Sequence, residues 1–157
     1  MATVSSAPAP GMQQIDLSKL SVQQLAQLKQ QLDQEIGVIQ ESLQTLKMAQ
    51  GKFHESEQSL ERITPDTEGE TILVPLTGSM YVPGTVADIK HVLIDIGTGY
   101  YAQKDVEGGK DYFKRKVKFV TEQMEKIQAV GWEKKNIQDT ICQLLGMKIQ
   151  AQKTTTS

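Results

Sequence analysis

The residues that could do covalent or acid–base chemistry are few and scattered in this chain. Ser79, His91 and Asp95 are the three residue types of a nucleophilic triad, but their order alone does not support one, and small hairpins would lack the surrounding shell. His54 and His91 do not form a metal-ligand pattern. Cys142, the single cysteine, has no basic neighbour that would activate it as a nucleophile. We therefore expect no enzyme activity, no cofactor and no metal.

The segment VLIDIGTGYY, residues 92–101, is the strongest candidate for a cofactor site. It is similar to the first motif of S-adenosylmethionine-dependent methyltransferases, in which a strand ends in an acidic residue and a Gly-x-Gly turn. Asp95, Gly97 and Gly99 fit this motif, but Tyr101 stands where a third glycine often occurs. The motif leads into a short strand and one long helix, which cannot complete a doubly wound sheet. We favour a hairpin turn and keep a small transferase as an alternative to be tested.

The chain has one basic cluster, made up of Lys114, Arg115, Lys116 and Lys118. Its functional interpretation is nuclear import or nucleic-acid binding. We favour a solvated helix flank, because we expect no aromatic residues between the cations on the exposed face. The 17 basic and 19 acidic residues leave a net charge of -2, so the molecule as a whole has no positive electrostatic field that would attract a polyanion. We therefore expect no nucleic-acid partner.

Composition indicates a polar, helical protein. Aromatic residues make up 5% of the chain, fewer than a compact globule of this length usually needs, whereas glutamine is abundant. No segment reaches the roughly 18 apolar residues of a membrane span, and the N-terminus has no secretory pattern. A single cysteine favours a reducing compartment. We expect a cytoplasmic protein without a membrane partner, and a nuclear pool stays open.

Two long amphipathic helices are predicted, over residues 21–63 and 105–150. Ser21 and Gln24 form a capping box at the first start, and Asp105 is an N-cap residue at the second. In the first helix an apolar residue recurs at every seventh position, at Leu25, Leu32, Ile39, Leu46, Phe53 and Leu60. Such a heptad pattern is typical of a coiled coil. Residues 1–20 are predicted as a disordered arm and residues 154–157 as a tail.

The similar lengths of the two helices predict an antiparallel two-helix coiled coil. The expected register opposes Leu32 to Ile141 and Phe53 to Val120, to within one turn of helix. It also brings Lys134 and Lys148 to the seam, which should therefore be sealed least well toward the chain termini.

The segment between the helices, residues 71–103, predicts two β-hairpins. Turns are expected at Thr77-Gly78, at Pro83-Gly84 and at Gly97-Thr98-Gly99. Two hairpins cannot enclose a core of their own, so their apolar side chains need a partner sheet. The predicted subunit-assembly residues are Ile72, Val74, Leu76, Val82, Val92, Ile94 and Ile96.

This order of elements resembles the alpha-class subunits of the prefoldin family. ILVPLTGSMYVPG (72–84) and HVLIDIGTGYY (91–101) are similar to the strand signature of that family, and QLDQEI (31–36) and KDYFKRKVKFVTEQMEKIQ (110–128) to its helices. The resemblance implies a mainly α fold over residues 21–153, in which an antiparallel two-helix coiled coil carries two inserted β-hairpins. It also implies that the strands join an intersubunit β-barrel in a heterohexamer with other alpha and beta subunits.

The resemblance further implies a function. The family holds unfolded chains such as actin and tubulin at the coiled-coil tips without ATP, and passes them to the cytosolic chaperonin. The expected client-binding residues at the tips are Leu25, Leu28, Ile141, Leu144, Leu145, Met147 and Ile149. The same side chains could instead close the hairpin of their own chain. The alternative function is a structural or adaptor coiled coil in a prefoldin-like scaffold complex.

Overall fold

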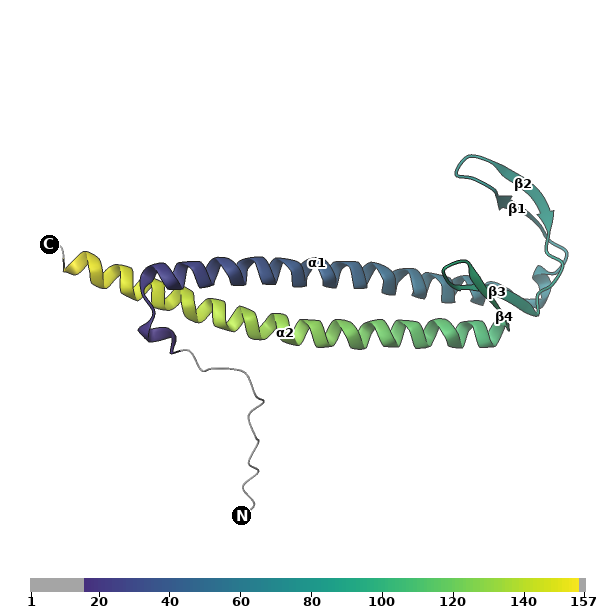
Figure 1. Ribbon diagram of the computed structural model, residues 1–157. Helices are drawn as coiled ribbons and strands as arrows, with labels where there is room; N and C mark the ends of the chain where they lie inside the picture. The colour runs from purple at the N-terminus through teal and green to yellow at the C-terminus, as the bar shows by residue number, and fades with distance from the viewer. Residues whose placement is uncertain (1–15, 156–157) are drawn as a thin grey trace, which may run out of the picture. The chain divides into compact units, whose positions relative to one another are not determined.

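The computed structural model describes residues 16–155 and contains two long helices joined through two strand pairs (Figure 1). Along the chain the elements are η1 (Leu17–Lys19), α1 (Val22–Glu61), η2 (Pro65–Thr67), β1 (Thr71–Pro75), β2 (Tyr81–Thr85), β3 (His91–Gly97), β4 (Tyr100–Asp105) and α2 (Val106–Thr154). The predicted fold class, mainly helical with two hairpins between two helices, is confirmed.

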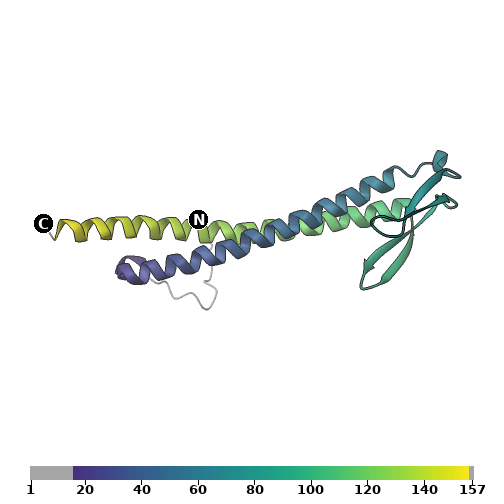
Figure 2. The same cartoon turned by 90° about the horizontal axis from the view of Figure 1, so that it is seen from above.

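The chain divides into two compact units. The terminal unit consists of the residues up to Val38 and those from Gly131 onward, and the central unit is Ile39–Val130. Both helices contribute to both units. Within each unit the segments of α1 and α2 run antiparallel and side by side, in the view of Figure 1 and from above in Figure 2.

Local side-chain contacts define where the helices begin. The Ser21 backbone N–H donates to Gln24 Oε1 (3.0 Å) and the Gln24 N–H donates to Ser21 Oγ (3.2 Å), so the predicted capping box is confirmed. At the start of α2 the Gly108 N–H donates to Asp105 Oδ1 (3.0 Å), which confirms Asp105 as a capping residue. Pro65 opens η2 shortly after α1 ends at Glu61.

Ordered structure begins before the predicted start of the helix. Residues 1–15 of the predicted arm, and residues 156–157 of the predicted tail, lie outside the described residues. Within the arm, Leu17–Lys19 form the 3-10 turn η1, where the Ser18 N–H donates to Asp16 Oδ1 (3.2 Å). Leu17 and Leu20 pack on the apolar cluster of the terminal unit. Apolar contact therefore holds a segment that composition alone assigned to a disordered arm.

The terminal unit closes around three buried side chains. Leu25 and Ile141 are fully buried, and Leu32 is 6% exposed. These three form one cluster, so Leu32 and Ile141 pack together, in agreement with the expected register to within a turn of helix. Residues of the heptad track of α1 therefore meet α2 as the period predicts.

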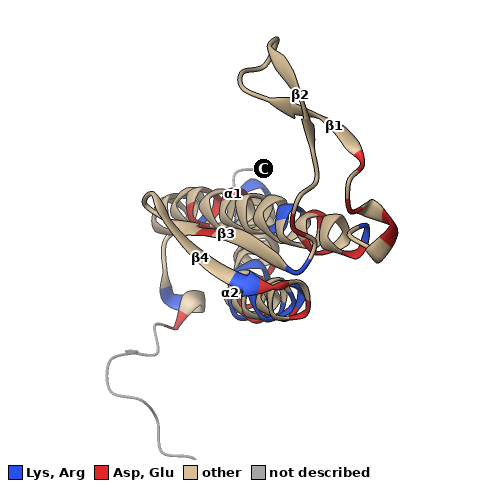
Figure 3. Cartoon of the chain, turned by 90° about the vertical axis from the view of Figure 1, so that its right-hand side faces the viewer, with Lys and Arg blue, Asp and Glu red and all other residues tan. Residues whose placement is uncertain are grey.

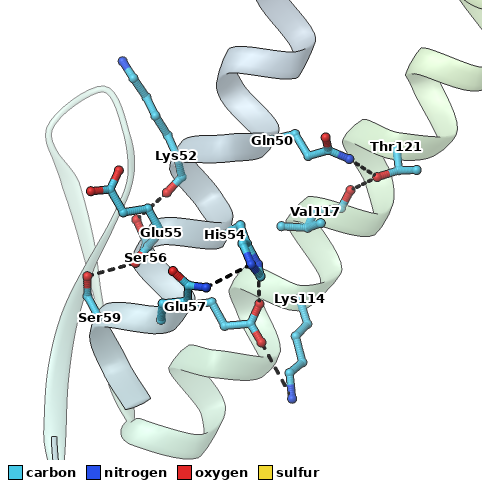
Figure 4. A network of polar contacts seen from close by, with 11 residues as sticks. Gln50, Lys52, His54, Glu55, Ser56, Glu57, Ser59, Lys114, Val117 and Thr121 are labelled. Carbon is cyan, nitrogen blue, oxygen red and sulfur yellow. Dashed lines mark hydrogen bonds and ion pairs between the residues drawn. The ribbon is translucent and has the colours of Figure 1, made fainter. Parts of the chain in front are cut away.

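The seam of the central unit combines apolar and polar contacts. The rings of Phe53 and Phe113 lie 6.4 Å apart, and Val120 is 6% exposed. Gln50 Nε2 donates to Thr121 Oγ1 (2.6 Å), as Figure 4 shows. Because Gln50 and Thr121 are neighbours of Phe53 and Val120 along their helices, the register agrees with the expected one to within a turn.

Pro83 and Gly84 lie inside β2 and do not form the turn expected from the sequence. They pair with Leu73 and Ile72 of β1. Hydrogen bonds from Val86 N–H to Glu70 O (3.0 Å) and from Leu76 N–H to Met80 O (2.8 Å) bracket the ladder. Since hydrogen-bonded pairs alternate in an antiparallel ladder, Pro83 falls at a position whose backbone nitrogen faces away from β1. A proline is tolerated there because the ladder needs no donor from it.

The second hairpin turns where the glycine motif predicts. Thr98 (φ 50°) and Gly99 (φ 80°) both have positive φ, as a two-residue type I′ turn requires. Gly97 pairs with Tyr100, and the register shifts between Asp95 and Gly97. The Gly-x-Gly motif thus serves a bulge and a tight turn between β3 and β4.

Gly109, in the first turn of α2, allows a close contact within the central unit. A methyl carbon added at Gly109 would lie 3.0 Å from Leu60 Cδ1, 3.2 Å from Ile94 Cδ1 and 3.3 Å from Val92 Cγ2. The end of α1, the strand β3 and the start of α2 therefore meet at a position where no side chain fits without displacing a neighbour.

Replacing Gly109 with Val is expected to destabilise the chain by about 1–3 kcal/mol, because the added methyl groups overpack this contact. Thermal unfolding of the full chain, followed by circular dichroism, measures the effect. Gly51→Val in α1 is the matched control, since nothing lies within 4 Å of its added carbon. Helix propensity favours Val over Gly at both positions, so an equal loss of stability in both variants would contradict the packing explanation.

Candidate interaction surfaces

The histidine and the aspartate of β3 that could do chemistry make contacts with residues close to them in the sequence. The Gly97 N–H donates to Asp95 Oδ1 (2.9 Å), and His91 Nδ1 lies 3.1 Å from Asp88 Oδ2. His91 and Asp95 are four residues apart on an extended strand, roughly 13 Å, so they do not form a histidine–aspartate pair. The methyltransferase motif requires a crossover helix after its strand, but β3 is followed by β4. The motif-like segment therefore lies in a different structural setting.

No group of three or more potential metal ligands occurs among residues 16–155. No helix in that range is long and apolar enough to cross a membrane. Cys142 is exposed on α2 and is not the half-buried residue that a position beside Ile141 would suggest.

The basic cluster is partly paired within the chain. Lys114 Nζ lies 3.8 Å from Glu57 Oε1, and Arg115 Nε lies 3.1 Å from Asp111 Oδ2. Figure 4 shows Lys114 reaching across to Glu57, which His54 also approaches. The expectation that no aromatic residue lies among the cations is wrong, because Tyr112 and Phe119 line a surface hollow with Arg115 and Lys116. The apolar periodicity identified the face of α2 that contacts α1, but it did not reveal the outer face that carries this hollow.

The predicted tip residues differ in exposure within the terminal unit. Leu25 and Ile141 are fully buried in the seam. Leu28, Leu144 and Leu145 are partly buried and pack on them. Met147 is 62% exposed and Ile149 is 43% exposed. In this closed arrangement, Met147 and Ile149 are the members of the predicted set that offer substantial surface to another molecule.

In the described part of the terminal unit, three other exposed apolar side chains were not among the predicted client-binding residues. They are Val38, Trp132 and Ile137, with exposures of 63%, 70% and 44%. Trp132 is the single tryptophan of the chain. A large ring off the heptad track is the signal that could have identified it, because tryptophan is enriched at protein interfaces.

Polar contacts also join α1 and α2 in the terminal unit. Lys134 Nζ donates to Glu35 Oε2 (2.6 Å), and Gln138 Nε2 donates to Asp33 Oδ1. The hydrogen bond from Lys134 lowers the pKa of the Glu35 carboxyl, with a smaller contribution from Gln31. The bond from Lys29 and then that from Gln138 lower the pKa of Asp33. Lys134, expected to weaken the seam, instead forms an ion pair across it.

Acid is expected to loosen the terminal unit. A carboxyl whose pKa is lowered by folding stabilises the fold above its ordinary pKa, and this stabilisation is lost as the pH falls through the lowered value. For Glu35 and Asp33 the ordinary values are 4.5 and 3.8, so the loss begins below about pH 4.5. The midpoint of thermal unfolding, measured by circular dichroism from neutral pH down to about pH 3, should fall in this range.

Glu35→Gln should remove part of this pH dependence, because Gln keeps the size of the side chain but does not titrate. Glu41→Gln, on the same helix, is the matched control, and Glu41 forms no ion pair across the seam within the described residues. Identical acid profiles for the wild type and Glu35→Gln would contradict the assignment.

The first hairpin presents apolar side chains on both faces. Ile72, Val74 and Val82 share one face and are 44%, 37% and 39% exposed. Leu73 and Tyr81 lie on the other face and are 69% and 53% exposed. Figure 3 shows no charged residue on β2 and a charge only near the start of β1. The sequence analysis named one face, whereas the structure leaves both uncovered.

The second hairpin is covered by its own chain on one face. Ile94 is 4% exposed, and Val92 is half-buried beside Gly109. Ile94 was expected to contact a partner, but Leu60 and Gly109 already surround it in the central unit. Leu93, 70% exposed, and Tyr101, 62% exposed, lie on the opposite face. Strand alternation shows two faces but not which of them the helices cover.

Comparisons with known proteins identify the family. The sequence model described as "Prefoldin subunit" matches residues 32–151. The chain belongs to the prefoldin subunit family. It is 50% identical over 148 residues to "Probable prefoldin subunit 5" of Drosophila melanogaster, covering 94% of this chain and 88% of the relative. It is 46% identical over 138 residues to "Prefoldin subunit 5" of Homo sapiens, covering 88% and 90%. This confirms the resemblance stated from the sequence.

A solved structure of the filamentous PFD from Methanocaldococcus jannaschii is also similar. The match has a TM-score of 0.45 and 22% identity, and it covers 82% of this chain and 98% of that chain. Prefoldin subunits are chaperone subunits and not enzymes, and the family implies assembly with other prefoldin subunits.

Proposed function

We propose that this prefoldin subunit works in a heterohexamer with other alpha and beta subunits, as an ATP-independent co-chaperone of the cytoplasm. The complex captures unfolded proteins of the actin and tubulin type and delivers them to the cytosolic chaperonin. Its relatives in fly and human are named prefoldin subunit 5, and we propose that this chain fills the corresponding place. The observation that carries client capture is the exposure of Met147 and Ile149 in the last part of α2.

Capture would use the exposed side chains first. Apolar surface gains about 25 cal/mol per Å² when it is covered, so each contact is weak and several must act together. Methionine adapts to differently shaped partners, which suits Met147 to clients of varied sequence. Arms of several subunits around one client would add their contacts through a high effective concentration.

The partly buried tip residues would act as a second set. Leu28, Leu144 and Leu145 become available only if α1 and α2 separate at the tip, which also opens the cluster of Leu25 and Ile141. Lys148 opposes this opening, because its ammonium donates to the carbonyl oxygens of Ser18 (2.8 Å) and Leu20. Client binding at Leu25 and Ile141 therefore costs the free energy of opening the seam, whereas binding at Met147 and Ile149 does not.

The decisive experiment uses the complex reconstituted from this chain and its partner subunits. Denatured actin is diluted into buffer without nucleotide, and light scattering follows its aggregation. Near-stoichiometric complex should suppress aggregation, and adding chaperonin and ATP should then yield native actin. Unchanged aggregation, combined with tight binding of a defined native partner, would support the adaptor function in a scaffold complex instead.

A further inference from the structure

The outer flank of α2 in the central unit carries a surface hollow. Tyr112, Arg115, Lys116 and Phe119 line it, and its volume is about 250 Å³. These positions follow the i, i+3, i+4, i+7 spacing, so they share one face of the helix. Phe119 is 57% exposed, although a phenylalanine would normally be covered.

This face differs from the one that contacts α1. Phe113 meets Phe53, and Val120 is buried at 6% exposure, so both belong to the inner face. Tyr112 joins the two faces, because its ring packs edge-on against Phe113 at 5.3 Å. Over this stretch α2 therefore has a second face, on which two rings lie on either side of two cations.

The charge around the hollow is positive and only partly balanced. Arg115 is paired with Asp111. Lys116 lies over the Tyr112 ring, 5.5 Å from its centre, and this contact leaves its charge uncompensated. Within residues 16–155, neither Lys116 nor Lys118 has an acidic partner at ion-pair distance. A hollow lined by two rings and by the uncompensated ammonium of Lys116 favours a ligand that is both apolar and anionic.

We propose that this hollow binds an acidic peptide segment of a partner protein, with one large apolar side chain seated on Phe119 and acidic residues facing Lys116. The volume of about 250 Å³ accommodates one such side chain. The site lies in the central unit and is separate from the tip residues Met147 and Ile149. It therefore does not depend on client capture at the tips.

Nucleic acid fits this surface less well. Affinity for nucleic acid comes largely from cations that neutralise phosphates, whereas two of the four cations of the cluster are already paired with Glu57 and Asp111. Base stacking needs free ring faces, and Lys116 already covers the Tyr112 ring. One exposed phenylalanine is enough to anchor a peptide side chain.

The test uses the reconstituted complex and fluorescence polarisation. The probe is a labelled peptide in which one Phe lies between runs of Asp and Glu. We expect saturable binding that weakens as salt is raised, and about tenfold weaker binding when the Phe of the peptide is replaced by Ser. Lys116→Ala and Phe119→Ala in the protein should each weaken binding about tenfold.

Matched variants test the location. Lys52→Ala and Met48→Ala remove an exposed cation and an exposed apolar side chain from α1 in the same unit, and both should bind the peptide as the wild type does. Circular dichroism checks that all four variants fold. Equal binding by Phe119→Ala and the wild type overturns the proposal, as does no binding to the complex. Tighter binding of a labelled single-stranded oligonucleotide than of the peptide overturns it in favour of nucleic acid.

Discussion

A subunit in which Val74 and Val82 are both replaced by Asp is expected to stay out of the assembled complex. The two valines oppose each other in the β1–β2 ladder and are 37% and 39% exposed. Burying an unpaired carboxylate in an apolar interface costs several kcal/mol, and two of them exceed what a subunit contact can offset. Co-expression with the partner subunits, followed by size-exclusion chromatography, measures incorporation.

Thr71→Asp combined with Thr85→Asp is the matched control. These residues pair across the same ladder and place the same two charges on the same hairpin, but they replace polar side chains. The control should assemble nearly as well as the wild type, which would exclude charge repulsion within the hairpin as the cause. Normal incorporation of the valine variant would show that this face stays open in the complex.

The second large effect concerns client capture. Met147→Ser combined with Ile149→Ser should leave assembly intact and weaken capture of denatured actin by about tenfold or more. The side chains are 62% and 43% exposed, so their loss leaves no cavity. Covering a side chain of this size contributes about 1.5–3 kcal/mol, and 1.4 kcal/mol corresponds to a factor of ten in affinity.

Met48→Ser combined with Val130→Ser is the control for client capture. It removes two apolar side chains of similar exposure, 60% and 47%, from the central unit. Light scattering without nucleotide should separate the two variants clearly. If both variants suppress aggregation as well as the wild type, clients bind elsewhere, and the seam residues Leu25 and Ile141 become the next candidates.

Patterns along the chain were sufficient to predict the two helices and their antiparallel pairing. The heptad track through Leu25 and Leu32 predicted α1, and Ser21 and Asp105 predicted the starts of the two helices. These features depend on contacts between residues at most four apart, or on a period repeated over many turns. Such information is present in the sequence without knowledge of the fold.

Proline and glycine were less informative where pairing outweighed local preference. Pro83-Gly84 has the composition of a turn, yet both residues lie in β2 because the register turns the proline nitrogen away from β1. Gly97 and Gly99, in contrast, occupy the turn that their positive φ values allow. The difference arises from the ladder, which a dipeptide preference cannot describe.

Exposure of individual side chains was decided by tertiary packing. Alternation places Val92 and Ile94 on one face and Leu93 and Tyr101 on the other, but only the contact with Leu60 and Gly109 shows which face is covered. The burial of Ile141 and the exposure of Met147, six residues apart on α2, depend in the same way on where α1 lies. Sequence periodicity groups residues into faces, whereas burial depends on which other segment packs against each face.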